Sequence, residues 1–170
     1  MSNKVSFLIG SESDRKTVEA SLDYFKYFDI DVEITVMSAH RNPLEVKEFS
    51  ASARSNGYSV LICGAGMAAH LGGAVKANTT LPVIGVPLAG GMMDGLDSLL
   101  STVQMPGGIP VACVAIGKPG ATNAAWLAAQ IVAIGDPTLE KRISSARQSN
   151  VKSVRSKNTA LQSTLGAKLT

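Results

Sequence analysis

Short apolar runs recur along the chain, and between them lie longer stretches in which apolar residues return every three or four positions. The first run, Val5–Ile9, is almost entirely apolar and partly β-branched, which is typical of a strand buried on both faces of a sheet. The stretch after it places Val18, Leu22 and Phe25 at helical spacing. The pattern predicts strands at Val5–Ile9, Val32–Met37, Ser59–Cys63, Val83–Val86 and Val111–Ile116.

Capping residues and prolines mark the helix starts. Ser13 or Asp14 can cap the first helix. Asn42-Pro43 has the form of an N-cap and a first helical residue, and Asp136-Pro137 repeats that form before a final helix. Strands that alternate with helices predict an α/β fold, with a parallel sheet between two layers of helices. Right-handed crossovers then bring the strand-to-helix turns to one edge of the sheet.

The length and composition fit one globular domain. The chain has 170 residues, of which 45% are hydrophobic and 17% charged, and this composition argues against disorder. We expect the domain to span residues 1–158, including a C-terminal helix, with a loose tail at residues 159–170. The first apolar run is too short for a signal peptide, and no apolar stretch is long enough to cross a bilayer. We therefore expect a cytoplasmic protein.

Small or apolar residues surround nearly every side of the helix predicted over Ala121–Ile134. A helix of this kind is usually buried on more than one side. It could be the central core helix of a monomer. Its alanines would also permit close approach by another subunit, and on this basis we favour an oligomer.

The charge of +3 is distributed unevenly. Residues 141–170 hold seven basic residues and no acidic one, so the rest of the chain has nine basic and thirteen acidic residues, a net charge of −4. A basic tail can bind nucleic acid. Because this tail has no aromatic residue for base stacking and its charges are diluted by Ser and Thr, we favour a solvated helix with a frayed end.

Several site classes find little support in the sequence. Cys63 and Cys113 both lie in apolar runs, where reduced core thiols are the usual state and a disulfide or metal pair is the alternative. His40 and His70 are too few ligands for zinc. The chain has no GxGxxG motif followed by an acidic residue at dinucleotide spacing, which argues against NAD. It also lacks a Ser-His-Asp arrangement and a cysteine in a basic loop.

Side chains suited to chemistry gather in three turns that follow predicted strands: Gly10-Ser11-Glu12-Ser13-Asp14, Ser38-Ala39-His40-Arg41 and Gly64-Ala65-Gly66-Met67-Ala68-Ala69-His70. In open α/β sheets, ligands bind outside the carboxyl ends of the strands. The first turn offers hydroxyls and backbone N–H groups to a phosphate, and Asp14 could accept hydrogen bonds from ribose hydroxyls. The glycines of the third turn would let the backbone approach a flat ring closely.

His40 lies among small and cationic residues rather than on an apolar face. Imidazole titrates near neutral pH and can both take and give a proton. Arg41 presents planar donors that match phosphate or carboxylate. Together these residues predict a phosphorylated sugar substrate and a proton to move. His70, in its Ala and Leu context, is more typical of a structural residue, although it could orient His40 or be a second ligand.

Six motifs occur in one order along the chain: GSESD (10–14), SAHRNP (38–43), GAGMAAHLGG (64–73), LPVIGVP (81–87), GLDSLLSTVQMPGGIPV (95–111) and AIG (115–117). In that order they resemble the bacterial-type N5-carboxyaminoimidazole ribonucleotide mutase family of purine (IMP) biosynthesis, known as PurE class I. The resemblance runs from about residue 4 to residue 136. The chain departs from the pattern where Met67 replaces a frequent glycine, where Gly72 replaces a frequent proline, and in the loop Ala89–Met93.

The resemblance implies a flavodoxin-like, three-layer αβα sandwich that assembles as a homo-octamer and uses no metal or organic cofactor. The implied reaction is an isomerisation that moves a carboxylate from the exocyclic nitrogen of the substrate to carbon 4 of its imidazole ring. It proceeds by decarboxylation and recapture of CO2. An enclosed pocket matters because only confinement keeps a small neutral molecule from escaping.

Residue roles also follow from the resemblance. His40 corresponds to the general acid/base. Ser11, Ser13 and Arg41 correspond to the 5′-phosphate site, and Asp14 to the residue that binds the ribose hydroxyls. The wall around the ring and the migrating carboxylate corresponds to Ser38, Ala39, Gly64, Ala65, Gly66, His70 and Leu71.

Two other functions remain as alternatives. A related animal-type enzyme carboxylates the aminoimidazole ribonucleotide directly with CO2, but its third turn resembles AGRSN, whereas this chain has GAGMAAHL. A non-catalytic flavodoxin-like module could hold a nucleotide or flavin. The proposed ligand turns contain no aromatic residue to sandwich a flavin ring, which disfavours the flavin.

Overall fold

A single parallel sheet forms the centre of the molecule in a computed structural model of the chain, which describes residues 2–169. Its strands run in the order β2-β1-β3-β4-β5, which is the flavodoxin-like order. All neighbouring strands are parallel. The predicted fold class is therefore confirmed. The strands are β1 (Lys4–Ile9), β2 (Asp31–Val36), β3 (Tyr58–Gly66), β4 (Val83–Leu88) and β5 (Ala112–Cys113).

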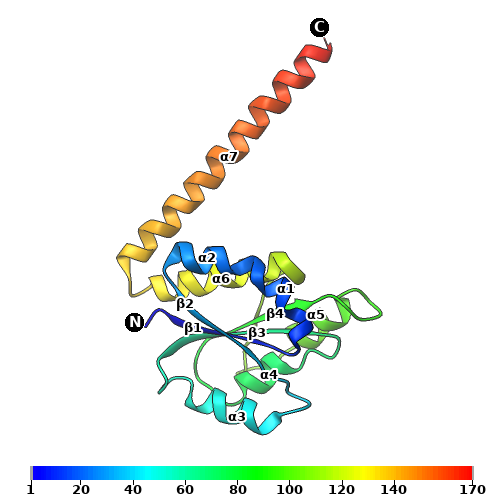
Figure 1. The fold of residues 1–170 in the computed structure, drawn as a ribbon, viewed down its shortest axis with the longest axis vertical. Coiled ribbons are helices and arrows are strands. Elements are labelled where there is room, and N and C mark those ends of the chain that lie inside the picture. The colour runs from blue at the N-terminus through cyan, green and yellow to red at the C-terminus, as the bar shows by residue number, and fades with distance from the viewer. Residues whose placement is uncertain (1, 170) are drawn as a thin grey trace.

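Helices cover both faces of the sheet, as Figure 1 shows, with α1, α2 and α6 on one side and α3 and α4 on the other. The central strands are buried on both sides because their side chains alternate between the two layers. Phe7 of β1 packs toward α6, and Leu8 packs toward α3 and α4. The helices are α1 (Arg15–Val18), α2 (Leu22–Phe28), α3 (Pro43–Ser52), α4 (Leu71–Lys76), α5 (Leu96–Val103), α6 (Gly117–Ala133) and α7 (Pro137–Leu169).

Local structure differs from the sequence prediction in two places. The first helical stretch is interrupted, since 3-10 turns at Glu12–Asp14 and Glu19–Ser21 precede α1 and α2. Ser11, rather than Ser13 or Asp14, provides the side-chain cap at its start. The fifth strand is also shorter than predicted, because only Ala112–Cys113 pairs with β4.

The alanine-rich helix α6 is a core helix of the chain itself. Its alanines at 121, 124, 125, 128 and 129 are all fully buried against the sheet and the neighbouring helices. The monomer-core interpretation therefore accounts for this apolar stretch. The prediction of an oligomer has to rest on other surfaces.

The final helix α7 is anchored only at its start, where Leu139 and Ile143 are buried in the core. From residue 147 to residue 166 every side chain is exposed, and Figure 1 shows the helix projecting away from the body. We expected a loose tail over residues 159–170, but the helix continues to Leu169, and Thr170 lies outside the described residues. Within residues 2–169, no helix combines the length and apolarity needed to cross a membrane.

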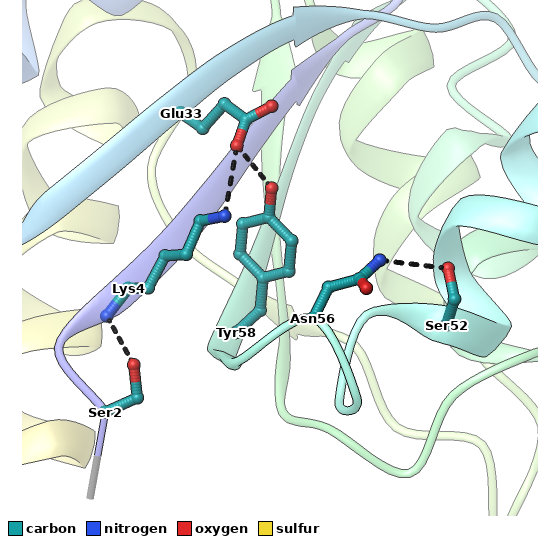
Figure 2. A network of polar contacts seen from close by, with 6 residues as sticks. All are labelled: Ser2, Lys4, Glu33, Ser52, Asn56 and Tyr58. Carbon is teal, nitrogen blue, oxygen red and sulfur yellow. Dashed lines mark hydrogen bonds and ion pairs between the residues drawn. The ribbon is translucent and has the colours of Figure 1, made fainter.

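A polar network joins three neighbouring strands near their starts (Figure 2). The hydroxyl of Tyr58 donates to the Glu33 carboxylate, and Lys4 Nζ lies 3.4 Å from the same carboxylate. Lys4 Nζ also lies 4.2 Å above the Tyr58 ring. The hydrogen bond from Tyr58 lowers the pKa of the Glu33 carboxyl. The network therefore holds β1, β2 and β3 together away from the carboxyl edge of the sheet.

Candidate functional site

A cavity of about 730 Å³ lies at the carboxyl edge of the sheet, and it is formed by the turns that follow β1 to β4. This is where parallel α/β sheets place their ligands. The cavity is lined by eleven of the predicted site residues: Ser11, Ser13, Asp14, Ser38, Ala39, His40, Arg41, Ala65, Gly66, His70 and Leu71. The structure thus brings the three predicted turns together in one place.

In the first turn, Ser11 organises the groups available to an anion. Its Oγ accepts hydrogen bonds from the Ser13 backbone N–H at 3.4 Å and from the Ser13 hydroxyl at 2.9 Å. Because this oxygen accepts both bonds, its own proton is directed elsewhere and can be donated to a ligand.

The second turn is held rigid by its own hydrogen bonds. The Asn42 side-chain oxygen accepts from the Ser38 N–H at 2.7 Å, and the Ser38 hydroxyl oxygen accepts from the Arg41 N–H at 3.3 Å. Arg41 Nη2 donates to the Gly10 carbonyl at 2.5 Å, which joins the second turn to the first. This bond places the guanidinium at the first turn, and the group retains further donors for a bound anion.

His40 and His70 come from different turns and face each other inside the cavity. His40 Nε2 lies 2.8 Å from His70 Nδ1, and the two rings meet edge to face. At this distance one nitrogen donates a proton and the other accepts it. Both rings are exposed to the cavity rather than packed in the core. Of the two roles left open for His70, a partner of His40 fits this contact.

Asp14 is the acidic group of the cavity wall. Partial burial raises the pKa of its carboxyl, against the opposing effects of a backbone hydrogen bond with Ser11 and attraction to Arg41. A carboxylate that has lost part of its hydration gains from hydrogen-bond donors on a ligand, and sugar hydroxyls are such donors.

One predicted site residue does not line the cavity, and the fourth turn was not predicted as part of the site. Gly64 is buried within β3, where an added Cβ would meet Phe7 and Leu88 at 3.3–3.4 Å. Ala89 and Gly90, which follow β4, line the cavity together with Gly10, Met67 and Ala68. The position of Ala89 and Gly90 directly after a parallel strand was the signal that could have identified them.

The sheet order and the polar cavity at its carboxyl edge define a flavodoxin-like α/β protein whose site combines hydroxyls, a guanidinium and paired imidazoles. Comparison with known proteins is more specific. The sequence profile of the family described as AIR carboxylase matches residues 4–153, and the chain belongs to this family.

Named relatives support this assignment. The chain is 46% identical over 151 residues to the N5-carboxyaminoimidazole ribonucleotide mutase of Escherichia coli, covering 89% of each chain. It is also 46% identical to the Bacillus subtilis enzyme of the same name, covering 88% of this chain and 93% of that one. Among solved structures, Treponema denticola PurE is 29% identical with a TM-score of 0.79, over 94% of this chain and 98% of that chain.

Proposed function

We propose that the protein is an N5-carboxyaminoimidazole ribonucleotide mutase, an isomerase of purine biosynthesis. Its substrate is then a small phosphorylated aminoimidazole riboside. The observation that carries the proposal is the convergence of His40 and His70 with Ser11 and Arg41 in a single cavity. The two curated relatives described above carry the same enzyme name.

Binding is assigned to the two ends of the cavity. Ser11, Ser13 and Arg41 hold the 5′-phosphate through hydroxyl and guanidinium donors, which are suited to an anion. Asp14 accepts hydrogen bonds from the ribose hydroxyls. The imidazole ring and its carboxylate then lie against Ser38, Ala39, Ala65, Gly66, His70 and Leu71, and Gly64 supports this wall from within β3.

The chemical step uses His40 as general acid and then as general base. His40 protonates the exocyclic nitrogen while the nitrogen–carboxylate bond breaks, and the electron pair of that bond remains on nitrogen. Carbon 4 of the ring then attacks the released CO2, and a new carbon–carbon bond forms. The proton on carbon 4 passes to His40, which restores its starting state. The sequence of steps balances without an external electron donor or acceptor.

His70 is assigned the role of orienting His40. The 2.8 Å contact fixes the direction of the His40 ring, and it couples the position of the proton to both imidazoles. Holding an acid/base group in the correct tautomer and orientation is a recognised contribution to proton transfer.

The decisive experiment supplies the N-carboxylated nucleotide in buffer freed of bicarbonate and follows the ring-carboxylated product. We expect turnover without ATP or bicarbonate. We expect His40→Asn to fold normally, checked by circular dichroism, and to lose at least about 100-fold in kcat. Strong dependence on bicarbonate would instead favour the direct carboxylase, and near-normal activity of His40→Asn would show that the proton carrier is misassigned.

We further propose that the chain assembles as a homo-octamer in the cytoplasm. Apolar side chains remain exposed on several elements of the described chain, which supports association; among them are Ile34 and Val36 on β2, Leu96, Leu100 and Val103 on α5, and Val151, Val154, Leu161 and Leu165 on α7. Association would remove these side chains from water, which is favourable. Native mass spectrometry should give the mass of eight chains, and a monomer as the main species would overturn the proposal.

A further inference from the structure

We propose that Asn42 is a positioning residue for the proton transfer, because its side-chain oxygen fixes the turn from which His40 reaches His70. The inference rests on the proposed function, since it explains how the acid/base group of that reaction is held in place. Within the described chain, Asn42 does not itself line the cavity, so we assign its effect to His40 rather than to contact with the substrate.

Asn42 stands at the start of α3, but its side chain does not serve that helix. It occupies the N-cap position before Pro43, where an asparagine oxygen usually accepts a hydrogen bond from a backbone N–H of the first helical turn. Among the residues that the structure describes, the Asn42 side chain makes no such bond. Its oxygen accepts instead from the backbone N–H of Ser38 at 2.7 Å, on the other side of the turn.

Asn42 holds Ser38 through both of its backbone groups. The Ser38 carbonyl accepts a hydrogen bond from the Asn42 N–H at 3.0 Å, in addition to the bond from the Ser38 N–H to the Asn42 side chain. The Ser38 hydroxyl oxygen also accepts from the Arg41 N–H at 3.3 Å. The three residues between Ser38 and Asn42 therefore have both ends fixed, and His40 is the middle one.

The rigidity of this turn matters more for His40 than for Arg41. The Arg41 guanidinium has an anchor of its own, because it donates to the Gly10 carbonyl at 2.5 Å. The His40 ring is exposed, and it meets His70 of a different turn at 2.8 Å. Proton transfer is efficient only when the donor and the acceptor are held at the correct distance and angle. Loosening the turn should therefore slow the chemical step more than it weakens phosphate binding.

Asp136 provides a matched control, because it stands before Pro137 at the start of α7. Its carboxylate oxygen does cap the helix, since it accepts from the Thr138 N–H at 2.9 Å and from the Leu139 N–H at 3.1 Å. Asp136 lies outside the cavity lining. If Asn42 were only a structural residue at a helix start, Asn42→Ala would behave like Asp136→Ala.

The first readout is steady-state turnover of the N-carboxylated nucleotide. For Asn42→Ala we expect kcat to fall about tenfold while KM changes by less than about threefold, because a misplaced acid/base group slows the chemical step. Asn42→Asp should restore kcat to within about threefold of the unaltered chain, since it keeps an oxygen acceptor of the same size and position. Asp136→Ala should lower the urea concentration at the midpoint of unfolding and leave kcat and KM unchanged.

The second readout does not depend on activity. The chain contains two histidines, His40 and His70, so ¹⁵N labelling at histidine gives an NMR spectrum of these two rings alone. In the unaltered chain, the ¹⁵N shifts should show one facing nitrogen with a proton and the other without it. In Asn42→Ala the shifts should move toward the averaged values of a freely exchanging imidazole. Asn42→Asp and Asp136→Ala should keep the pattern of the unaltered chain.

Normal kcat or an unchanged ¹⁵N pattern in folded Asn42→Ala would overturn the role of Asn42. A failure of Asn42→Asp to restore kcat, or an equal fall of kcat in Asp136→Ala, would also overturn it. Asn42→Gly replaces the alanine variant if that variant does not fold, because glycine is well tolerated at N-caps. None of these results decides the proposed function, which fails separately if the unaltered chain requires bicarbonate for turnover.

Discussion

The hydrogen bond between His40 and His70 has room for a single proton between the two ring nitrogens. If both nitrogens carried protons, two N–H groups would face each other at 2.8 Å, so full protonation of the pair has to separate the rings. This arrangement suits a group that takes up one proton and returns it within a catalytic cycle. The same contact gives His70 a role in the cavity, although its Ala and Leu context in the sequence is more typical of a structural residue.

Asp14 allows a test in which stability and binding change in opposite directions. Burial raises the pKa of its carboxyl above the unfolded value, so ionisation of Asp14 opposes folding. The stabilisation that comes from the protonated carboxyl is complete below the pKa of the unfolded state. It is lost as the pH rises through the raised pKa of the folded state. Asp14→Asn cannot ionise. At pH 7 we expect it to raise the free energy of unfolding by less than about 1 kcal/mol, since the carboxylate is partly exposed and screened.

Urea unfolding of Asp14→Asn and the unaltered chain, measured from pH 7 down toward about 3.9, should show the difference shrinking as the pH falls. The KM for the nucleotide should rise about tenfold, because charge-assisted hydrogen bonds to the ribose are lost. A variant that is less stable at pH 7, or that binds substrate unchanged, would contradict this account of Asp14.

The contact between β4 and α5 positions the fourth turn of the site. An added Cβ at Gly85 would lie 2.4 Å from Thr102 Cγ2, so the helix approaches β4 closely only because residue 85 is glycine. Ser98 of α5 donates to the Leu88 carbonyl at 2.9 Å, which fixes the end of the strand. Ala89 and Gly90 follow directly and line the cavity.

The network at the strand starts should affect stability without affecting catalysis. Tyr58→Phe removes the hydrogen bond to Glu33 while keeping the ring that packs under Lys4. We expect a loss of about 1 kcal/mol in the free energy of unfolding, the usual net value of one hydrogen bond, with kcat and KM unchanged. Denaturant unfolding and steady-state assays check both expectations. A large fall in activity at unchanged stability would contradict a purely structural role for this end of the sheet.

Sequence patterns predicted the elements well where burial decides their type. Val5–Ile9 is recognisable as a strand because both of its faces are apolar, and it lies within β1. The patterns were less reliable where backbone hydrogen bonding decides where a strand or a helix begins and ends. The apolar run at Val111–Ile116 looks like a full strand, but only two of its residues pair with β4. Nothing in the spacing of Val18, Leu22 and Phe25 reveals the 3-10 turn that interrupts the helix before Leu22.

At the scale of the whole molecule, the location of the site was predictable because parallel topology brings the strand ends together. The shortest contacts between its side chains were not predictable. The approach of His40 to His70 and the bond from Arg41 to the Gly10 carbonyl depend on how the strands are offset. Gly64 was predicted as part of the wall because it belongs to the motif, but the alternation of β3 directs it into the core. The exposed course of α7 also lies beyond what residue spacing can show.

The most direct test of the central claim is a crystal structure of the protein with bound ring-carboxylated nucleotide. We expect the 5′-phosphate to contact Ser11, Ser13 and Arg41, and the carboxylated ring to lie within hydrogen-bond distance of His40. A nucleotide bound elsewhere on the protein, or a His40 ring turned away from the heterocycle in every subunit, would contradict the account.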